Sequence, residues 1–383
     1  MRGFEVKRMK AIALSNLVGL SLAVSTQSFA ASASYSGLYV FGDSLSDSGN
    51  VFAATSVSPV PPFTEATPLS PPYFYGRFSN GPNFADVLAA KLGLAQNAVG
   101  LNPSLTPAAG ALFPYGSNYA WGGASTGPAV LPVGGLQVPS IFRSTLPSAQ
   151  ELPSQLQLFG AALQGAGKPA DPNALYVLWG GGNDLRDAVQ WAKDNPAKAF
   201  SDGEAVVSAA IGNLQGALST LKALGAQHVL VPNAPDLGLA PETRDWNTNP
   251  QFSLTAYATV LSGNFNVRLD NLLDSFDGLR VIPFDTYGLF NQVNARPGDF
   301  GFTNTSDACL PGELSVYIGG MPCSTPNQYL YWDNHHPSAT MHAVLGEAMY
   351  AATVPEPQTV LLWVIGVGAL VATAKRKGSK RVG

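Results

Sequence analysis

The stretch at residues 40–49, "VFGDSLSDSG", decides the fold class because an apolar run ends there in a polar turn. Buried parallel strands read as short apolar runs rich in β-branched residues and bounded by Gly, Asn or Asp. The whole first run covers residues 37–43, and three later runs end the same way, at residues 174–181, 227–233 and 279–285. The sequence therefore predicts four strands of a mostly parallel sheet.

Helical patterns separate these runs, at residues 81–93, 202–225 and 252–276. Alternation of strands and helices predicts an α/β fold in which helices cover both faces of an open sheet. In such a sheet the ligand site lies beyond the carboxyl ends of the strands, which is where Ser44 falls. Two segments rich in proline or glycine, residues 56–75 and 102–139, are predicted to be long loops over these strand ends.

The composition favours one large catalytic domain. The chain has 383 residues, of which 46% are hydrophobic, enough for one extensive core. Only 12% of residues are charged and the formal net charge is -4, so the sequence has no basic face for DNA or RNA. Nucleic acid is therefore excluded as a partner.

Residues 1–30 are predicted to be a signal peptide. Basic residues at positions 2, 7, 8 and 10 precede an apolar run at 11–24, and small residues follow it. Cleavage after Ala30 and cleavage after Ala33 both fit this pattern. The body at residues 31–353 is then the exported catalytic domain.

Residues 354–383 are predicted to be a sorting tail. "VPEP" at 354–357 is followed by an apolar segment, shorter than the roughly 20 residues of a typical membrane-spanning helix, and by the basic cluster "KRKGSKRVG". This arrangement resembles the PEP-CTERM sorting signal of Gram-negative bacteria, which implies processing by an exosortase and delivery to the cell envelope. A plain C-terminal membrane anchor is the alternative interpretation.

Cys309 and Cys323 are the only cysteines of the chain. Export places them in an oxidising compartment, which favours a structural disulfide over two free thiols. Two cysteines without nearby histidines make a poor zinc site, and the sequence contains no other ligand cluster. No metal is predicted.

Ser44 is the candidate nucleophile, and a serine hydroxyl needs a base to take its proton. Four histidines are present. His228 opens a predicted strand, so its expected role is structural. His342 falls within a predicted helix and is expected to pack there or to be exposed. That leaves the segment "DNHHP" at residues 333–337 as the source of the base.

Asp333 and His336 are three residues apart, so on one helical turn the carboxylate can accept the imidazole Nδ1–H and leave Nε2 facing outward. Pro337 suits the first position of the following helix. His335 is expected to point to another side of the turn and is the weaker candidate. A surface capping turn is the alternative interpretation of this spacing.

Donors for an oxyanion are also required in an acyl-transfer site. Asn183 in "WGGGND" is expected at a strand end with its amide free, and Gly122 and Gly123 in "NYAWGGAS" offer backbone N–H groups. Turn formation is the simpler explanation of either glycine run. Neither run continues into a P-loop or a dinucleotide fingerprint, so no phosphate or dinucleotide cofactor is predicted.

Four separated motifs, "FGDSLSDSGN", "NYAWGGAS", "GGND" and "DNHH", resemble in order and context the blocks of the GDSL or SGNH hydrolases. The likeness covers most of residues 37–349. It implies a flavodoxin-like three-layer fold with about five parallel strands, and it supports the bridge between Cys309 and Cys323. No metal or organic cofactor is implied.

Carried over residue by residue, the resemblance implies that Ser44 is the nucleophile, His336 its base and Asp333 the residue that orients the base. The backbone N–H of Ser44, the side chain of Asn183 and the backbone N–H of Gly123 would hold the oxyanion. Gly122 is the alternative register for the glycine.

The sequence therefore predicts an exported serine ester hydrolase that works through a covalent acyl-enzyme. Apolar and aromatic residues in "SPPYFYGRF" and "SNYAW" favour an acyl-chain ester, as in an esterase or lipase. An O-acetyl esterase acting on envelope or exopolysaccharide sugars is the alternative within the same class. A surface-anchored binding or matrix protein on a hydrolase scaffold is the alternative from another class, and His336 lying far from Ser44 would favour it.

Overall fold

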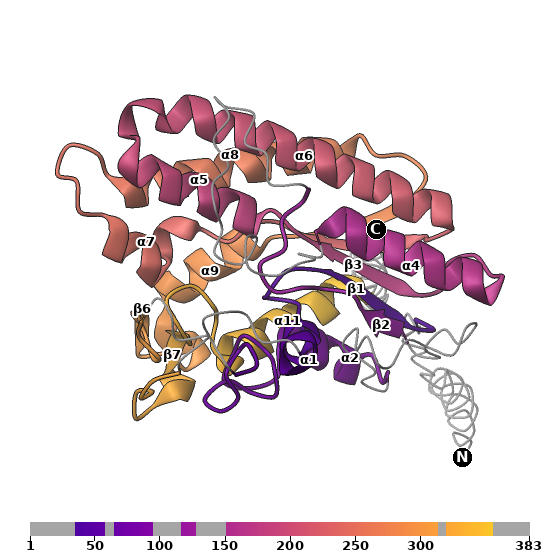
Figure 1. Cartoon of the computed structure of the whole chain (residues 1–383), viewed down its shortest axis with the longest axis horizontal. Helices are drawn as coiled ribbons and strands as arrows, with labels where there is room; N and C mark the ends of the chain where they lie inside the picture. Colours follow the sequence, from indigo (N-terminus) through magenta and orange to yellow (C-terminus); the bar gives the residue numbers. More distant parts are fainter. Residues whose placement is uncertain (1–34, 58–64, 95–115, 128–150, 313–318, 355–383) are drawn as a thin grey trace, which may run out of the picture. The chain divides into compact units, whose positions relative to one another are not determined.

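A five-stranded parallel sheet forms the centre of the fold (Figure 1). The computed structural model describes residues 35–57, 65–94, 116–127, 151–312 and 319–354. The strands are β1 (Leu38–Gly42), β2 (Gly116–Asn118), β3 (Leu175–Trp179), β4 (His228–Pro232) and β5 (Arg280–Phe284), in the order β2-β1-β3-β4-β5. All four pairings are parallel. The predicted α/β class and flavodoxin-like sheet are confirmed.

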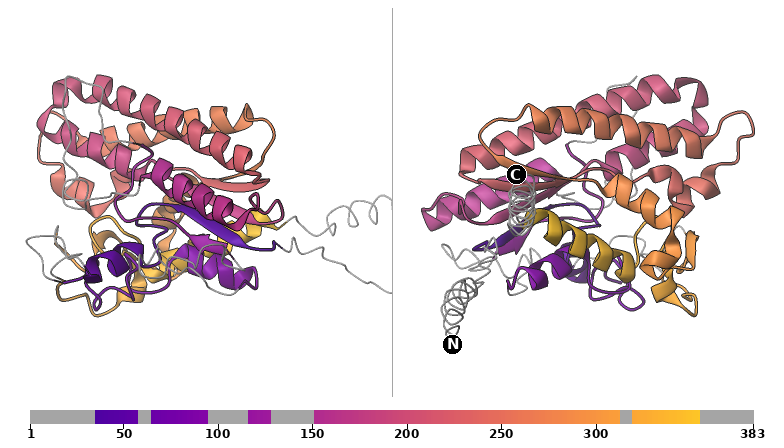
Figure 2. Two further views of the ribbon diagram at one scale, coloured as in Figure 1. Left: turned by 45° about the vertical axis from the view of Figure 1, so that its right-hand side comes forward. Right: turned by 180° about the vertical axis from the view of Figure 1, so that it is seen from behind.

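Helices cover both faces of this sheet, with one helical layer on each side of the strands (Figures 1 and 2). One layer holds α4 (Leu152–Ala166), α5 (Gly182–Asp194), α6 (Ala199–Leu224) and α8 (Leu254–Asp274). The other layer holds α1 (Asn50–Val57), α2 (Phe84–Lys91) and α11 (Ala339–Thr353).

The remaining elements lie near the carboxyl ends of the strands. They are α7 (Pro241–Trp246), α9 (Thr286–Ala295), and the strands β6 (Asn304–Ala308) and β7 (Tyr329–Tyr331), which pair in a separate two-stranded ribbon. Short 3-10 turns occur at Pro196–Lys198, Leu237–Leu239, Pro297–Phe300 and Pro326–Gln328. The turn at Leu237–Leu239, α9 and β7 each contribute to the pocket described below.

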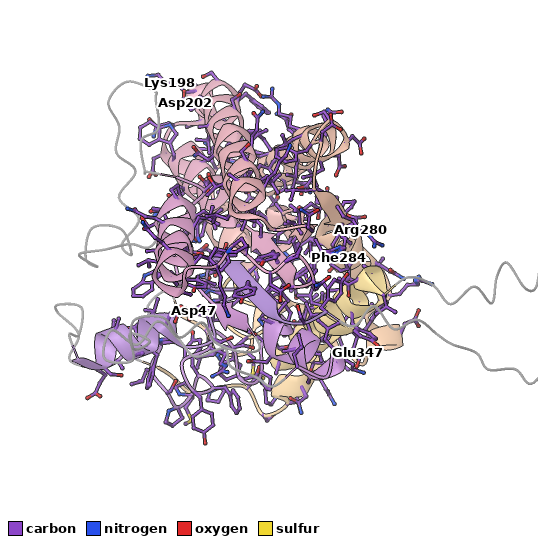
Figure 3. The ribbon with its side chains drawn as sticks, turned by 90° about the vertical axis from the view of Figure 1, so that its right-hand side faces the viewer. Asp47, Lys198, Asp202, Arg280, Phe284 and Glu347 are labelled. Carbon is purple, nitrogen blue, oxygen red and sulfur yellow. A yellow bond between two sulfur atoms is a disulfide. The ribbon has the colours of Figure 1, made fainter. Side chains whose placement is uncertain are left out.

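Side chains alternate between the two faces because successive residues of a strand point in opposite directions. Tyr39 and Phe41 of β1 belong to the core cluster beneath α4, α5, α6 and α8. On the other face, Trp179 of β3 meets Phe84 of α2 edge-on, with ring centroids 5.1 Å apart. The inner strands are thus buried on both faces, whereas β5 is an edge strand with partly exposed side chains; Figure 3 labels Arg280 and Phe284 at its two ends.

Polar caps mark where the helices that flank the site begin. Asn83 caps α2 by accepting a hydrogen bond from the backbone N–H of Asp86, whose side chain reaches back to the Asn83 N–H. Ser338 caps α11 by accepting from the N–H of Met341. These caps fix the starting points of the two helices that pack together on the second face.

The four strands predicted from the sequence are present, but β2 was missed. It lies inside the segment 102–139 that the sequence predicted to be loop, and it has only three residues, Gly-Ser-Asn, with no apolar run. The predicted signal peptide and nearly all of the predicted sorting tail lie outside the described residues. Among the residues that are described, no helix is both long and apolar enough to span a membrane.

Candidate active site

Ser44 lies on a tight turn directly after β1. Gly42 ends the strand at a position where a Cβ atom would lie 2.6 Å from the carbonyl oxygen of Trp179, so only glycine fits there. The turn closes through a hydrogen bond from the Asp47 N–H to the Asp43 carbonyl, 2.9 Å long. Ser44 is therefore held at the carboxyl edge of the sheet, where its side chain is partly exposed.

Asp47 joins this turn to the segment that contains the two adjacent glycines. Its carboxylate accepts the backbone N–H groups of Gly49, Asn50 and Val51 at the start of α1, and also that of Gly122, at 2.9 Å. Figure 3 shows Asp47 beside α1. The first two sequence motifs are thus held together by one buried carboxylate.

Two asparagines strengthen the same junction. Asn50 Nδ2 donates to the carbonyls of Asn118 and Ala120, while Asn118 Nδ2 donates to the Ser46 carbonyl and to Ser48 Oγ. All of these polar groups are buried, where an unpaired donor or acceptor is costly. The hydrogen bonds of Asp47, Asn50 and Asn118 therefore hold the Ser44 turn in shape.

Gln155 of α4 holds the residue that precedes the turn, and no sequence motif pointed to it. Its Oε1 accepts the Gly42 N–H at 2.9 Å and its Nε2 donates to the Gly42 carbonyl at 2.7 Å. The side chain is fully buried. Because the pairing joins positions 113 residues apart, only the tertiary structure reveals it.

The structure brings Ser44, His336 and Asp333 into one hydrogen-bonded chain. His336 Nε2 lies 2.8 Å from Ser44 Oγ, and His336 Nδ1 lies 2.7 Å from Asp333 Oδ2. A carboxylate accepts only, so Nδ1 carries the proton and Nε2 is left to accept from the serine hydroxyl. His336 and Asp333 are both buried, whereas Ser44 borders a pocket.

The turn that presents His336 is not helical, contrary to the sequence prediction. Asp333 Oδ1 accepts the backbone N–H groups of His335 at 3.0 Å and of His336 at 2.8 Å, which bends the chain. The Trp332 N–H donates to the His336 carbonyl and closes the loop. Pro337 is not at the first helical position either, because α11 begins at Ala339 after its Ser338 cap.

Burial and charge set the pKa of the acid in this chain. Burial alone would raise the pKa of Asp333, but the charges and hydrogen bonds of His336 and His335 outweigh it and hold that pKa well below its usual range. Burial raises the pKa of Asp43, next to the serine, to about 6, and the Leu45 N–H and the His336 charge offset only part of the shift. Asp333 is therefore the carboxylate that stays ionised.

His335 lines the same pocket as His336, so the expectation that it points to another side is wrong. Its ring packs against that of His336, with centroids 4.0 Å apart and the ring planes tilted by 45°, but it makes no hydrogen bond to Ser44 among the bonds of the described residues. Burial and the neighbouring His336 lower the pKa of His335 to about 4. It is thus a neutral wall of the pocket near neutral pH.

A partly buried ion pair lies next to His335. Arg186 of α5 forms a two-point pair with Glu242 of α7, through Nε to Oε2 at 2.7 Å and Nη2 to Oε1 at 2.6 Å. Glu242 Oε1 lies 3.7 Å from His335 Nδ1. No sequence pattern indicated this pair, because single Arg and Glu residues on different helices carry no local signal.

The two other histidines have structural surroundings. His342 is buried in α11, and its Nδ1 accepts the N–H of Phe84 at the start of α2. His228 is the first residue of β4, and its ring meets Tyr35 edge-on. Neither side chain lines the pocket at Ser44.

Asp333, His335 and His336 are close enough together to offer a metal ion three ligand atoms. One carboxylate and two imidazoles are a common set of ligands. Both nitrogens of His336 are already engaged, however, with Asp333 on one side and Ser44 on the other. A metal ion would have to break this chain, so the donor set fits acid–base chemistry better than metal binding.

Asn183 lines the pocket from the first turn of α5 rather than from a free strand end. Its Nδ2 donates one hydrogen bond to the Ala124 carbonyl at 2.8 Å. The prediction of a free amide is therefore wrong. An amide nitrogen carries two protons, and this bond uses one of them. The bond also orients the side chain.

The two glycine candidates differ in their backbone partners. The N–H of Gly122 is taken by Asp47, and a Cβ atom at this position would collide with the Phe78 ring at 2.4 Å. Gly123 has a φ of +81°, a conformation that favours glycine. The structure thus gives the two adjacent glycines different tasks.

The pocket at Ser44 is a cavity of about 60 Å³ with mostly apolar walls. Among the residues that line it are Leu45, Trp179, Leu237, Ala240, Phe290 and Tyr331. Arg186 and Asp236 add charged groups to the lining. The lining of the cavity therefore combines apolar side chains with a few charged groups.

Cys309 and Cys323 form a disulfide, with their Cα atoms 4.8 Å apart, so the predicted bridge is confirmed. The bridge is next to the segment that leads into the turn carrying His336. The N–H groups of Cys309 and Leu310 donate to the carbonyls of Tyr331 and Trp332, just before Asp333.

Comparison with known proteins identifies the family. Residues 38–349 match the model of the GDSL-like lipase/acylhydrolase family. The chain belongs to this family. The membership that the four motifs suggested is confirmed, and it places the chain among carboxylic ester hydrolases.

Curated relatives come from bacteria and plants. Over 343 residues the chain is 31% identical to an uncharacterized protein from the trpE-trpG intergenic region of Pseudomonas putida, covering 88% of this chain and 51% of that protein. It is 31% identical to the esterase EstA of Pseudomonas aeruginosa, covering 94% and 54%. It is 27% identical to acetylajmalan esterase 2 of Rauvolfia serpentina, covering 80% and 87%. The chain thus spans about half the length of these two bacterial relatives.

Proposed function

We propose that the protein is an exported serine ester hydrolase in which Ser44, His336 and Asp333 act as a catalytic triad. The observation that carries the proposal is the hydrogen-bonded chain from Ser44 through His336 to Asp333, with bonds of 2.8 and 2.7 Å. These are the distances over which a general base takes a proton from a nucleophile. Family membership supports the same chemistry.

In the first half of the reaction, His336 Nε2 accepts the hydroxyl proton while Ser44 Oγ attacks the ester carbonyl carbon. The carbonyl oxygen becomes an oxyanion. The bond to the alcohol oxygen then breaks, and the His336 imidazolium gives its proton to that oxygen. The products of this half are a free alcohol and an acyl group on Ser44.

In the second half, water attacks the acyl carbon and His336 accepts one of its protons. The bond to Ser44 Oγ breaks, the proton returns to that oxygen, and the acid leaves. Asp333 stays ionised throughout and stabilises the imidazolium. The lowered pKa of Asp333 supports this role.

The oxyanion is held in this proposal by the backbone N–H of Ser44, the backbone N–H of Gly123 and the side chain of Asn183. Asp47 already occupies the N–H of Gly122, which favours Gly123 as the donor. The second proton of Asn183 Nδ2 serves this role because Ala124 takes the first.

The apolar walls of the pocket support an ester with an acyl chain as the substrate. An O-acetyl ester of a sugar is the second candidate, favoured by the charged groups of Arg186 and Asp236 in the same pocket. One relative is named for an acetylated compound, acetylajmalan, which agrees with an acetyl group as the acyl part.

The proposal includes export, with residues 1–30 as a signal peptide and residues 354–383 as a PEP-CTERM-like tail handled by an exosortase. The disulfide supports export, since such bonds persist in oxidising compartments. N-terminal sequencing and the intact mass of the protein recovered from the cell envelope test this. A mature chain that keeps Met1 would contradict it.

Turnover of a chromogenic ester series from acetyl to long acyl chains tests the catalytic proposal. Ser44→Ala is expected to abolish turnover, and the chain-length profile to distinguish acetyl from long-chain specificity. Ser46→Ala is the matched control, because the buried Ser46 hydroxyl has no hydrogen-bond partner among the described residues. Full activity of Ser44→Ala would refute the proposal.

A further inference from the structure

Tyr73 reaches the triad from a loop far away in the sequence. It lies between α1 and α2, 260 positions before Asp333, and its side chain is only 2% exposed. Its hydroxyl donates to Asp333 Oδ2 over 2.7 Å. This is the same oxygen that accepts from His336 Nδ1.

Packing fixes the direction of this hydroxyl. The Tyr73 ring meets Trp332 edge-on, with centroids 5.9 Å apart, and belongs to a buried cluster with Phe78 and Trp121. The Tyr73 backbone N–H donates to the Leu69 carbonyl. A tyrosine held by both its ring and its backbone loses little further freedom when it forms a hydrogen bond.

Within the part of the chain that the structure describes, four hydrogen bonds reach Asp333, and they divide evenly between its two oxygens. Oδ1 accepts two backbone N–H groups, and Oδ2 accepts His336 Nδ1 and the Tyr73 hydroxyl. The backbone bonds hold one oxygen in the turn, and Tyr73 prevents the other from swinging away from the imidazole. A bond to a charged acceptor is roughly twice as strong as one between neutral groups.

We propose that Tyr73 is a positioning residue of the active site, which aims the Asp333 carboxylate at His336 and limits how strongly that carboxylate attracts the imidazole proton. The inference rests on the proposed function, because it assigns Tyr73 a role through the triad. Tyr73 is absent from the residues that line the pocket, so it does not act on the substrate directly.

The charged and titratable groups that face Asp333 are few. Among the described residues they are His335, His336, Tyr73, Arg186 and Glu242. Arg186 and Glu242 are paired with each other and balance in charge. Removing the Tyr73 hydroxyl therefore leaves the imidazolium of His336 as the main partner of Asp333 Oδ2.

Steady-state kinetics of Tyr73→Phe in the full chain test the proposal. The turnover number kcat is expected to fall about tenfold with KM unchanged, since loss of a hydrogen bond to a charged group acts only through the triad. The acid limb of the kcat/KM profile is expected to move upward by about half a pH unit, because a less satisfied carboxylate holds the imidazolium proton more tightly.

Tyr257→Phe is the matched control. The Tyr257 hydroxyl is also buried and donates to a carbonyl, that of Ala199, at 2.8 Å, but it lies on α8 away from the pocket. This variant also loses one buried tyrosine hydrogen bond, and it should keep wild-type kinetics. A kcat of Tyr73→Phe within twofold of wild type, with an unmoved acid limb, would overturn the inference.

Labelling by a fluorophosphonate, which reacts with activated serines, distinguishes the two levels of the proposal. If wild-type Ser44 is not labelled, the proposed function fails. If wild type is labelled and Tyr73→Phe is labelled at the same rate, only the role of Tyr73 fails. Should Tyr73→Phe not fold, replacing Tyr73 by 3-fluorotyrosine keeps the ring and hydroxyl, and unchanged kcat across pH 5–7 would then overturn the inference.

Discussion

Two turns meet at the candidate active site, residues 43–50 after β1 and residues 333–337 after β7, and each holds a buried aspartate beside a reacting side chain. Asp43 precedes Ser44, and Asp333 lies three positions before His336. Their exposed fractions are 4% and 1%. Their acidities nevertheless move in opposite directions: the pKa of Asp43 is raised to about 6 and that of Asp333 is held well below normal.

The difference lies in the donors that surround each carboxylate. The carboxylate of Asp43 accepts a hydrogen bond from the Leu45 N–H, which is too little to offset burial, so its pKa rises. Asp333 receives two backbone N–H groups, the His336 ring and the Tyr73 hydroxyl. Being next to the nucleophile in sequence does not make an aspartate the triad acid; the donors around it do.

Replacing the two aspartates in turn gives the largest expected effect. Asp333→Asn should lower kcat by about 10³- to 10⁴-fold, because the imidazole loses the carboxylate that fixes its tautomer. Asp43→Asn should lower kcat by at most about tenfold, since Asp43 makes no hydrogen bond to His336 among the bonds of the described residues. Equal losses in the two variants would remove the distinction between the turns.

A substitution at Asn183 tests the contribution of the first turn of α5, which lines the pocket beside the two turns. Asn183→Ala should lower kcat by about 10²- to 10³-fold with little change in KM, as expected for an oxyanion donor. Asn264→Ala on α8 is the matched control, since that amide donates to Glu204 instead. If KM rises in Asn183→Ala while kcat is kept, Asn183 binds substrate rather than the oxyanion.

Removing the disulfide tests how much the bridge stabilises the turn at residues 333–337, since the turn at residues 43–50 contains no cysteine. The double variant Cys309→Ser with Cys323→Ser should lose about 3 kcal/mol of unfolding free energy, the loop-closure estimate for a sequence separation of 14. Urea unfolding measures this loss. Below its Tm the variant should keep a kcat within about tenfold of wild type, because Asp333 and His336 are also held by backbone bonds. Unchanged stability would show that the bridge does not support this turn.

The smallest expected effect is a pH dependence of stability from Asp43. Burial raises the pKa of Asp43 from its ordinary value of 3.8 to about 6 in the folded protein. From pH 4 to 7 the unfolded chain therefore releases the proton first, and the stabilisation from this group is lost as pH rises. Asp333 has a lowered pKa, and its contribution is lost only as pH falls below about 4.

Asp43→Asn should therefore become more stable relative to wild type as pH rises. The expected gain between pH 4 and 7.5 is about 2 kcal/mol in urea unfolding. A matched series with Asp307→Asn, an exposed aspartate on β6, should show no such trend. A flat difference between Asp43→Asn and wild type would mean that Asp43 is ionised as readily in the folded protein as in the unfolded chain.

Much of the fold and the candidate site could be predicted from local sequence. The four longer strands can be recognised as apolar runs in the sequence. The motifs around Ser44, Asn183 and Asp333 contain the residues that favour their turns. β2 could not be predicted, because its three residues become a strand only by pairing with Leu38, Tyr39 and Val40 of β1.

The supporting residues could not be predicted for a related reason. Gln155 and Tyr73 act through partners 113 and 260 positions away, and nothing in their neighbouring sequence marks them. The helical spacing expected for Asp333 and His336 predicted the right side-chain contact but the wrong backbone. An aspartate whose carboxylate accepts the backbone N–H groups two and three positions ahead produces a non-helical turn in which the same contact forms.

The most direct test of the catalytic account is to trap the acyl-enzyme. Wild-type protein is mixed with a p-nitrophenyl ester, quenched in acid during turnover, digested and analysed by mass spectrometry. We expect one acyl group on the peptide that contains Ser44, and no acylated peptide from Ser44→Ala. Acylation at another residue, or turnover in both proteins with no acyl group on Ser44, would contradict it.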